Sequence, residues 1–139
     1  MPTYQSAENT ITLQFGDNWS YTPVAYPNVK AINETLSGGP ELGIGQDPFI
    51  AVEIIYSTSP AIEVGTNPLK RTFGNILVEF YTKEDSGSLQ NRINLDHLAA
   101  LFEYKTIEDI SFRDITVMRS GVKNGWYITP AMVRFYFYR

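Results

Sequence analysis

The sequence predicts a single α+β domain, with a mostly antiparallel, twisted sheet and one main helix packed on one of its faces. A short second helix at the N-terminus is an alternative to an irregular start of the chain. Runs of β-forming residues with period-two alternation dominate the chain, and only one of them leads at once into a clear helical pattern. A doubly wound parallel sheet needs a helix after most strands, so it is not expected. The length of 139 residues suggests one domain with a substantial core.

The N-terminal segment carries the weakest pattern. Residues 1–10 are polar and are expected to be poorly ordered. Ile11, Phe15 and Trp19 recur every four residues, which suits a short helix. Thr10, Thr12 and Gly16 weaken that pattern, so a strand over 10–15 competes with the helix.

Two strong strands and three less regular segments follow. Thr22–Asn28 contains two prolines, which predict an extended or edge segment. Strands are predicted at Pro48–Ser57 and Thr72–Thr82, where apolar residues occupy both alternating faces, so we expect both sides of the sheet to be partly covered. Val29–Asp47 and Ser57–Lys70 are expected to be long loops, the second with a hairpin at its tip.

The C-terminal part predicts two further strands. In Ile107–Met118 the apolar residues change parity around Arg113–Asp114, which indicates a bulge or a break. Lys123–Gly125 is a favourable hairpin turn, because Asn and Gly tolerate positive φ. The last strand is Trp126–Arg139, and Pro130 within it predicts an edge or a kink.

Composition excludes several classes of function. The chain has no cysteine, so it has neither a disulfide framework nor a thiolate metal site. Its formal charge of −4 argues against a surface built to grip nucleic acid. No apolar run approaches membrane-spanning length and no signal peptide is evident, so we expect a soluble protein made in a cytoplasm.

The strand–turn–helix segment around residue 85 is not expected to bind phosphate. A phosphate-binding loop needs several glycines followed by Lys and Ser or Thr. The hinge Lys83–Ser88 has one glycine and two acids, which suit the positive end of a helix dipole themselves. Ser86 or Ser88 is therefore expected to cap a helix that runs to about Phe102.

Catalytic chemistry is also not expected. His97 is the only histidine and lies inside the predicted helix, where a structural role is favoured. Glu53 and Glu79 interrupt strand faces and could form a carboxylate pair, but nothing in their spacing indicates one. No metal-ligand cluster and no cofactor site is predicted, so the expectation is a protein that is not an enzyme.

The predicted helix has more apolar surface than an isolated domain needs. One face consists of Leu95, Leu98, Ala99, Leu101 and Phe102. A second stripe consists of Leu89, Ile93 and Ala100, with His97 nearby. Flanking loops could cover this stripe; the alternative is that it packs against another chain. Five tyrosines near the strands and the helix end favour an interface.

Several short motifs follow one another along the chain. Phe15–Trp19 (FGDNW) and Thr22–Asn28 (TPVAYPN) come first. A Pro-aromatic opening then leads Pro48–Ile54, and an arginine-x-x-glycine pattern opens Arg71–Tyr81. The acidic hinge, the long helix and an aromatic-rich last strand complete the order. Over Phe15–Arg139 this order resembles that of the tail terminator, or tail-completion, proteins of tailed bacteriophages.

The resemblance implies a non-enzymatic α+β protein of the virion tail or neck, assembled in the host cytoplasm without a cofactor. Such proteins form hexameric rings that cap the tail tube, stop its polymerisation and present a joining surface to the head-side connector, while DNA passes through the lumen without specific binding. The chain departs from the group in two ways. Residues 1–15 are a poorer helix than usual, and the 29–47 loop is rich in glycine.

This resemblance, together with the helix pattern, gives the predicted interaction sites. The subunit interface is expected at the second stripe: Leu89, Ile93, His97 and Ala100. Loops reaching the tube subunits and the connector are expected to present Ile62, Glu63, Val64, Leu42 and Ile44.

Two alternatives stay open at this stage. A head–tail connector or neck adaptor would also be a ring-forming protein of similar size. A monomeric ligand-binding module would use the glycine-rich loop and exposed tyrosines, and it predicts a concave aromatic pocket.

Overall fold

The computed structural model describes residues 2–26, 48–57, 60–66, 68–85, 87–123 and 125–139. Within them, two helices and seven strands follow one another: α1 (Tyr4–Asn18), β1 (Val24–Ala25), β2 (Phe49–Tyr56), β3 (Arg71–Lys83), α4 (Leu89–Phe102), β4 (Thr106–Ile107), β5 (Ile110–Val117), β6 (Gly121–Lys123) and β7 (Trp126–Tyr138). The predicted α+β class is confirmed, and so are the main helix and the strands at β2, β3, β5 and β7.

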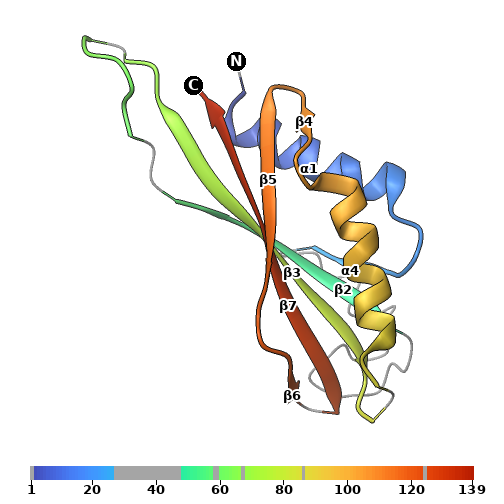
Figure 1. Ribbon diagram of the computed structural model, residues 1–139. Coiled ribbons are helices and arrows are strands. Elements are labelled where there is room, and N and C mark those ends of the chain that lie inside the picture. Colours follow the sequence, from blue (N-terminus) through green and yellow to red (C-terminus); the bar gives the residue numbers. More distant parts are fainter. Residues whose placement is uncertain (1, 27–47, 58–59, 67, 86, 124) are drawn as a thin grey trace.

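The strands form one sheet in the order β1-β2-β3-β7-β5-β4, with β6 also paired to β7. All described pairs are antiparallel except β1 with β2, which is parallel. The long strands β3 and β7 pair along their whole length, from Arg71 opposite Tyr138 to Lys83 opposite Trp126. They form the centre of a strongly twisted sheet, and both helices lie on the same side of it (Figure 1).

The core lies between this helix-bearing face and the two helices. Phe102 of α4 is fully buried, with its ring centroid 5.2 Å from that of Phe15 in α1 and 5.0 Å from that of Phe112 in β5. The side-chain amide of Gln14 also donates a hydrogen bond to the Leu101 carbonyl at 2.9 Å, which joins the helices directly. The two helices and the sheet therefore pack as one unit.

One close approach in the core explains a glycine in the middle of β3. Gly74 lies opposite Phe135 of β7, and a Cβ at this position would meet the Phe135 ring at 2.4 Å. Glycine in a strand interior commonly marks such a site, where an aromatic ring covers the backbone. The large Phe135 ring is buried there instead of a β3 side chain.

The N-terminal prediction needs correction. Residues 4–10 are not poorly ordered, and no strand forms over 10–15, because both stretches belong to α1. The Thr3 hydroxyl accepts a hydrogen bond from the Ser6 backbone and the Ser6 hydroxyl accepts one from the Thr3 backbone, which completes a capping box. Ala7, Ile11 and Phe15 are the buried residues of the helix. The narrow apolar stripe and the Ser in place of Glu or Gln in the box explain why the sequence pattern was weak.

The β5 bulge is confirmed. The pairing of β5 with β7 shifts register between Phe112 and Ile115, the stretch that contains Arg113 and Asp114. Gly125 has φ +83, in keeping with the predicted turn between β6 and β7.

Pro130 lies in a central strand, so the predicted edge or kink is wrong. It pairs with Glu79 on one side, and its carbonyl accepts a hydrogen bond from the Met118 N–H on the other. The nitrogen and the carbonyl of a strand residue point toward the same neighbour. The missing N–H of Pro130 would therefore face the chain between β5, which ends at Val117, and β6, which begins at Gly121. No hydrogen bond between paired strands is lost by placing proline there.

The helix α4 begins as predicted, and one of the two predicted capping serines is described. Ser88 occupies the N-cap position without a side-chain capping bond, and Ser86 lies outside the described residues. Inside the helix, Asn91 and Asn94 are buried although the sequence pattern placed only apolar residues on that face. The Asn91 amide nitrogen donates to the Phe80 carbonyl at 3.3 Å and to the Thr129 hydroxyl at 3.1 Å. This polar contact fixes α4 against β3 and β7.

Replacing Asn91 by alanine is expected to lower the free energy of unfolding by about 1–3 kcal/mol, because the Phe80 carbonyl and Thr129 lose a buried partner. Urea unfolding followed by circular dichroism measures the change. Arg92→Ala, at the exposed neighbouring position, should change it by less than about 0.5 kcal/mol. Equal effects of both substitutions would show that the buried amide has no special role.

Candidate functional site

The predicted second stripe of α4 faces away from the core. Leu89 is 71% exposed and Ile93 is 40% exposed, and Ala100 is also exposed. The helix instead buries Leu98, Leu101 and Phe102 against the sheet, with the two asparagines beside them. No described part of the chain covers the stripe formed by Leu89, Ile93 and Ala100, which we call the α4 stripe.

His97 does not belong to that stripe. Its ring stacks on Tyr21, with centroids 3.6 Å apart and planes 3° apart, and its edge faces Trp19 with centroids 6.4 Å apart. These contacts join α4 to the segment that follows α1, and His97 is half-buried. Within the described residues His97 makes internal ring contacts, and its predicted place in a subunit interface stays a prediction.

The segment between β2 and β3 forms an arm that projects away from the body of the molecule (Figure 1). Ala61 and Lys70 form an antiparallel bridge, and the Ile62 N–H donates to the Leu69 carbonyl at 2.8 Å. The Glu63 carboxylate accepts a hydrogen bond from the Leu69 N–H, also at 2.8 Å. The predicted hairpin in this loop is therefore confirmed, and Glu63 stabilises it.

The tip of this arm is apolar and exposed. Ile62 is 47% exposed and Val64 is 105% exposed. Both residues lie on a part of the chain whose backbone is held by the Ala61–Lys70 bridge and the hydrogen bonds above. Leu42 and Ile44, the other predicted contact residues, lie outside the described residues.

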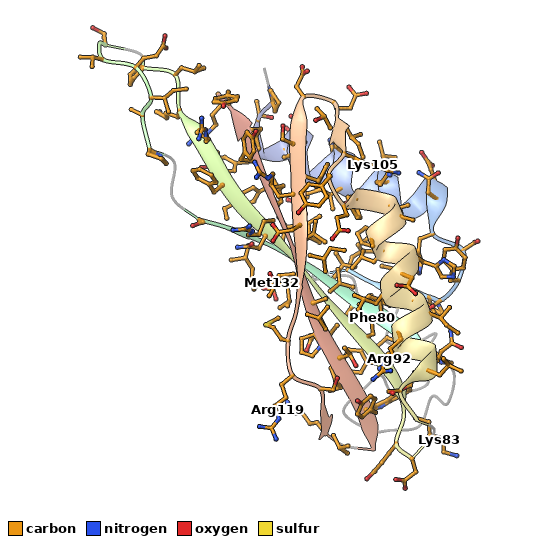
Figure 2. All side chains as sticks on the ribbon, in the orientation of Figure 1. Phe80, Lys83, Arg92, Lys105, Arg119 and Met132 are labelled. Atoms are coloured by element: carbon orange, nitrogen blue, oxygen red, sulfur yellow. The ribbon has the colours of Figure 1, made fainter. Side chains whose placement is uncertain are left out.

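The sequence pattern missed an open face of the sheet. Both helices cover one face, and on the other face Phe73, Leu77, Met132 and Tyr136 are half-exposed. Figure 2 shows Phe80 between the sheet and α4, with Met132 on the opposite side of the sheet. This agrees with the expectation that both faces are partly covered, because the side chains on this face are half-exposed and not fully buried. Alternation of apolar residues predicts which face a side chain occupies, but not what covers it.

Only one end of the open face carries a buried cluster. Phe49 and Trp126 are each 1% exposed, and the Phe49 ring stacks on Tyr81 with centroids 4.5 Å apart. The rest of the open face is a row of half-exposed side chains on three strands. We call this remaining part the open sheet face.

The carboxylates considered in the sequence occupy different environments. The Glu103 carboxylate accepts a hydrogen bond from the Ile115 N–H at 3.2 Å, which holds the end of α4 to β5. Glu53 and Glu79 lie at diagonal positions of β2 and β3 and line one shallow cavity of about 280 Å³ on the open sheet face. That cavity brings the two carboxylates onto one surface but contains no histidine.

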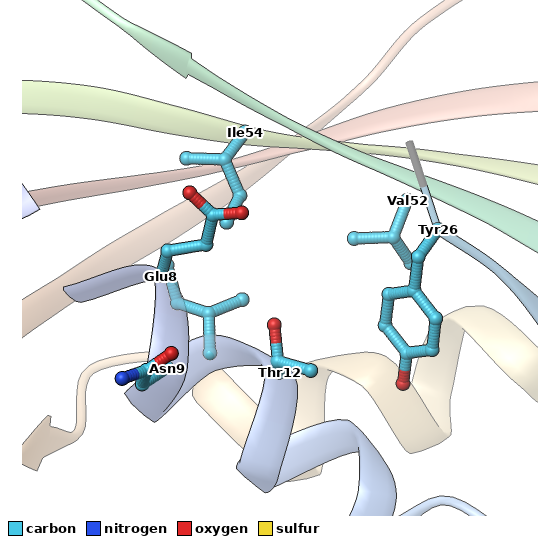
Figure 3. A pocket seen from close by; sticks show the side chains of 7 residues that line it. Glu8, Asn9, Thr12, Tyr26, Val52 and Ile54 are labelled. Carbon is cyan, nitrogen blue, oxygen red and sulfur yellow. The ribbon is translucent and has the colours of Figure 1, made fainter. Parts of the chain in front are cut away.

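A cavity of about 360 Å³ lies between α1 and β2. Figure 3 shows its two walls, with Glu8, Asn9 and Thr12 of the helix facing Val52 and Ile54 of the strand beside Tyr26. Its lining has one carboxylate, so it holds no acid–base pair of two carboxylates. It also has a single aromatic ring, where the ligand-binding alternative predicts an aromatic pocket.

Tyr56 lies near Glu8. Its hydroxyl donates to the Tyr4 carbonyl at 3.1 Å, and its ring packs edge-on against Tyr4 with centroids 4.7 Å apart. Burial, with the negative charge of Glu8 next and Tyr4 after it, raises the pKa of Tyr56 from 10.0 to about 12. Low polarity and a nearby carboxylate both disfavour the phenolate.

This pKa predicts how stability depends on alkaline pH. Between pH 10 and about 12 the unfolded chain loses the Tyr56 proton while the folded chain retains it. The contribution of Tyr56 is therefore complete below pH 10 and is lost as pH rises to about 12. Ultraviolet difference titration of the protein against Tyr56→Phe should find the high midpoint, and Glu8→Gln should lower it. An ordinary midpoint near 10 would contradict the burial of this phenol.

Metal and membrane features were also searched in the described residues. No three histidine or carboxylate side chains among them gather as a metal site. None of their helices is both long and apolar enough to cross a membrane.

Comparison with known proteins adds a fold likeness. No family model matches the sequence, and no curated protein matches it. Six chains of solved structures match. One of them has 14% sequence identity and a TM-score of 0.61, with 93% of this chain and 94% of that chain covered. At this identity the likeness is one of fold, over nearly the whole of both chains, and the name of that protein describes no activity.

Proposed function

We propose that this protein is a structural component of a bacteriophage tail: a tail terminator that assembles as a hexameric ring on the last ring of tube subunits, stops their polymerisation and offers a joining surface to the head side. On this proposal it acts in the virion tail or neck, is assembled in the host cytoplasm, and catalyses no reaction. The order of motifs from Phe15 to Arg139 supports the tail terminator family. The exposed apolar arm tip and the α4 stripe support a role in assembly.

The observation that carries the proposal is the projecting arm. Its backbone is bonded on both sides of the hairpin, yet its tip holds Ile62 and Val64 in water. A structured apolar tip far from the core is suited to bind a second protein, because burial there would remove about 25 cal/mol per Å² of apolar area from water. In a ring, each arm would reach a neighbouring subunit or the ring beneath it.

Ring closure also needs two different surfaces on each subunit, since a heterologous interface joins unlike patches. The α4 stripe is apolar and uncovered in the described chain, and it lies on the opposite side of the sheet from the open sheet face. It therefore supplies one half of such an interface. The formal charge of −4 would let DNA pass through the lumen without adhering to the wall.

The experiment that tests this role asks which neighbour the protein binds. The purified protein is mixed separately with tail-tube subunits and with the portal-side connector of the same phage, and each mixture is resolved by size. We expect the protein to remain bound to the tail-tube subunits and to stop the growth of tubes. Retention by the portal side alone would favour a head–tail connector instead. Val64→Asp should weaken tube binding, whereas Leu13→Asp, an exposed apolar position on α1, should not.

A further inference from the structure

Three arginines gather on the open sheet face. Arg71 of β3, Arg113 of β5 and Arg134 of β7 line one cavity of about 280 Å³, together with Phe73 and Tyr136. The whole chain has 11 lysines and arginines against 15 acids, so this concentration of positive charge is local. Neither the fold nor the assembly surfaces described above require it.

Arg71 is held in place by aromatic rings. Its guanidinium carbon lies 5.3 Å from the ring centroid of Tyr138, 5.5 Å from that of Tyr136 and 6.0 Å from that of Phe73. One terminal nitrogen donates to the Tyr138 hydroxyl at 3.0 Å. The buried Nε–H has no acceptor among the described residues. A guanidinium held in this way has little side-chain freedom left to lose when an anion binds its remaining terminal N–H groups.

The bulge in β5 brings Arg113 next to Arg134 of β7. Arg113 and Asp114 lie between Phe112, which pairs with Phe135, and Ile115, which pairs with Val133, so they lie beside Arg134 of β7. Arg134 already holds one carboxylate: its Nε donates to Asp114 at 2.9 Å, and its Nη2 donates to the same oxygen. This hydrogen bond holds the pKa of Asp114 below its usual value. Arg71 and Arg113 form no ion pair with a described residue, so two of the three guanidinium groups are free to bind a further carboxylate.

We propose that this arginine pocket binds the carboxylate side chains of an acidic peptide segment presented by a partner protein. The planar fork of arginine matches a carboxylate, and two free guanidinium groups give such a segment four or more donors. The inference goes beyond the tail-terminator proposal and stands without it, since it concerns a single folded chain.

A polynucleotide fits this surface less well than an acidic peptide. Binding to nucleic acid depends on many phosphate contacts along a basic track. Here the positive charge ends after three residues, and Glu53 and Glu79 line the adjoining cavity on the same face. A long polyanion that followed the sheet would therefore meet carboxylates. A short acidic segment needs only the arginine pocket.

Nuclear magnetic resonance on the full chain tests the pocket with hexaglutamate as the probe, at low ionic strength. The guanidinium signals of Arg71 and Arg113 are expected to shift as hexaglutamate binds their terminal N–H groups, and the titration should saturate. Arg71→Lys keeps the charge but loses the fork, and Arg113→Gln removes an exposed charge; each should raise the dissociation constant at least tenfold. Arg92→Gln on α4 is the matched control and should leave it unchanged.

Three results would overturn the proposal. One is the absence of any saturable shift with hexaglutamate. A second is equal weakening by Arg92→Gln, which would indicate unspecific attraction between charges. The third is tighter binding of a single-stranded oligonucleotide than of hexaglutamate at the same ionic strength, which would assign the surface to nucleic acid. Because Arg113 is exposed, its variant retains the fold even if Arg71→Lys does not.

Discussion

Replacing Phe102 by alanine is expected to lower the free energy of unfolding by about 3–5 kcal/mol, the range for deleting a large buried aromatic side chain. Phe102 is fully buried and its ring touches Phe15 of α1 and Phe112 of β5. The substitution would leave a cavity where both helices and the sheet meet. Each of these elements would lose a contact, and none of them can close the gap alone.

Urea unfolding of the purified protein measures the change, read by tryptophan fluorescence and by circular dichroism. Leu89→Ala on the same helix is the control, because Leu89 is 71% exposed, and it should shift the free energy by less than about 0.5 kcal/mol. A loss below about 1 kcal/mol for Phe102→Ala would show that the three elements do not share one core.

Replacing Ile93 by aspartate is expected to abolish ring assembly while leaving the subunit folded. Ile93 is 40% exposed at the centre of the α4 stripe, so a carboxylate there stays hydrated in the free subunit. In a closed interface the same carboxylate would be buried without a partner, at a cost of several kcal/mol at each of the subunit contacts. Circular dichroism should therefore be unchanged, while the mass in solution falls to that of one subunit.

Leu13→Asp on α1 introduces the same charge at another exposed apolar position and should not change assembly. If Ile93→Asp unfolded the protein, Ile93 would be a core residue and the α4 stripe would not be an interface. If it assembled normally, the ring would use another surface.

The elements with the strongest local patterns were predictable. Long alternating runs specify β3 and β7, and the change of parity at Arg113–Asp114 specified the bulge that the register shift confirms. The apolar spacing from Leu95 to Phe102 likewise specified the buried side of α4. In each case the period of the side chains alone decides the outcome.

The errors share a physical cause: they depend on contacts that are distant in the sequence. α1 forms from a weakly amphipathic segment because it packs on α4: Phe15 contacts Phe102 and Gln14 donates a hydrogen bond to the Leu101 carbonyl, and the Gln14–Leu101 bond spans 87 positions of the chain. The stacking of His97 on Tyr21 was not predicted, because Tyr21 lies on a distant segment. The buried Asn91 was missed because its acceptors belong to two strands.

The candidate surfaces were predictable in part. Ile93 was selected from the second apolar stripe of the helix and Val64 as a loop residue expected to reach a partner ring; both are exposed, and their contacts with a partner stay predictions. The arginine pocket could not be found, because Arg71, Arg113 and Arg134 meet only through the pairing of three strands and the bulge between two of them. An arginine pattern in sequence gives no signal for such a site.

On our proposal, six copies of this chain close into a ring that caps a tail tube. The particle mass and symmetry of the purified protein, alone and with tail-tube subunits, can be measured by light scattering after size separation and by electron microscopy. We expect six-fold rings of this chain, either free in solution or at the end of each tube. A protein that remains monomeric even with tube subunits present would contradict it.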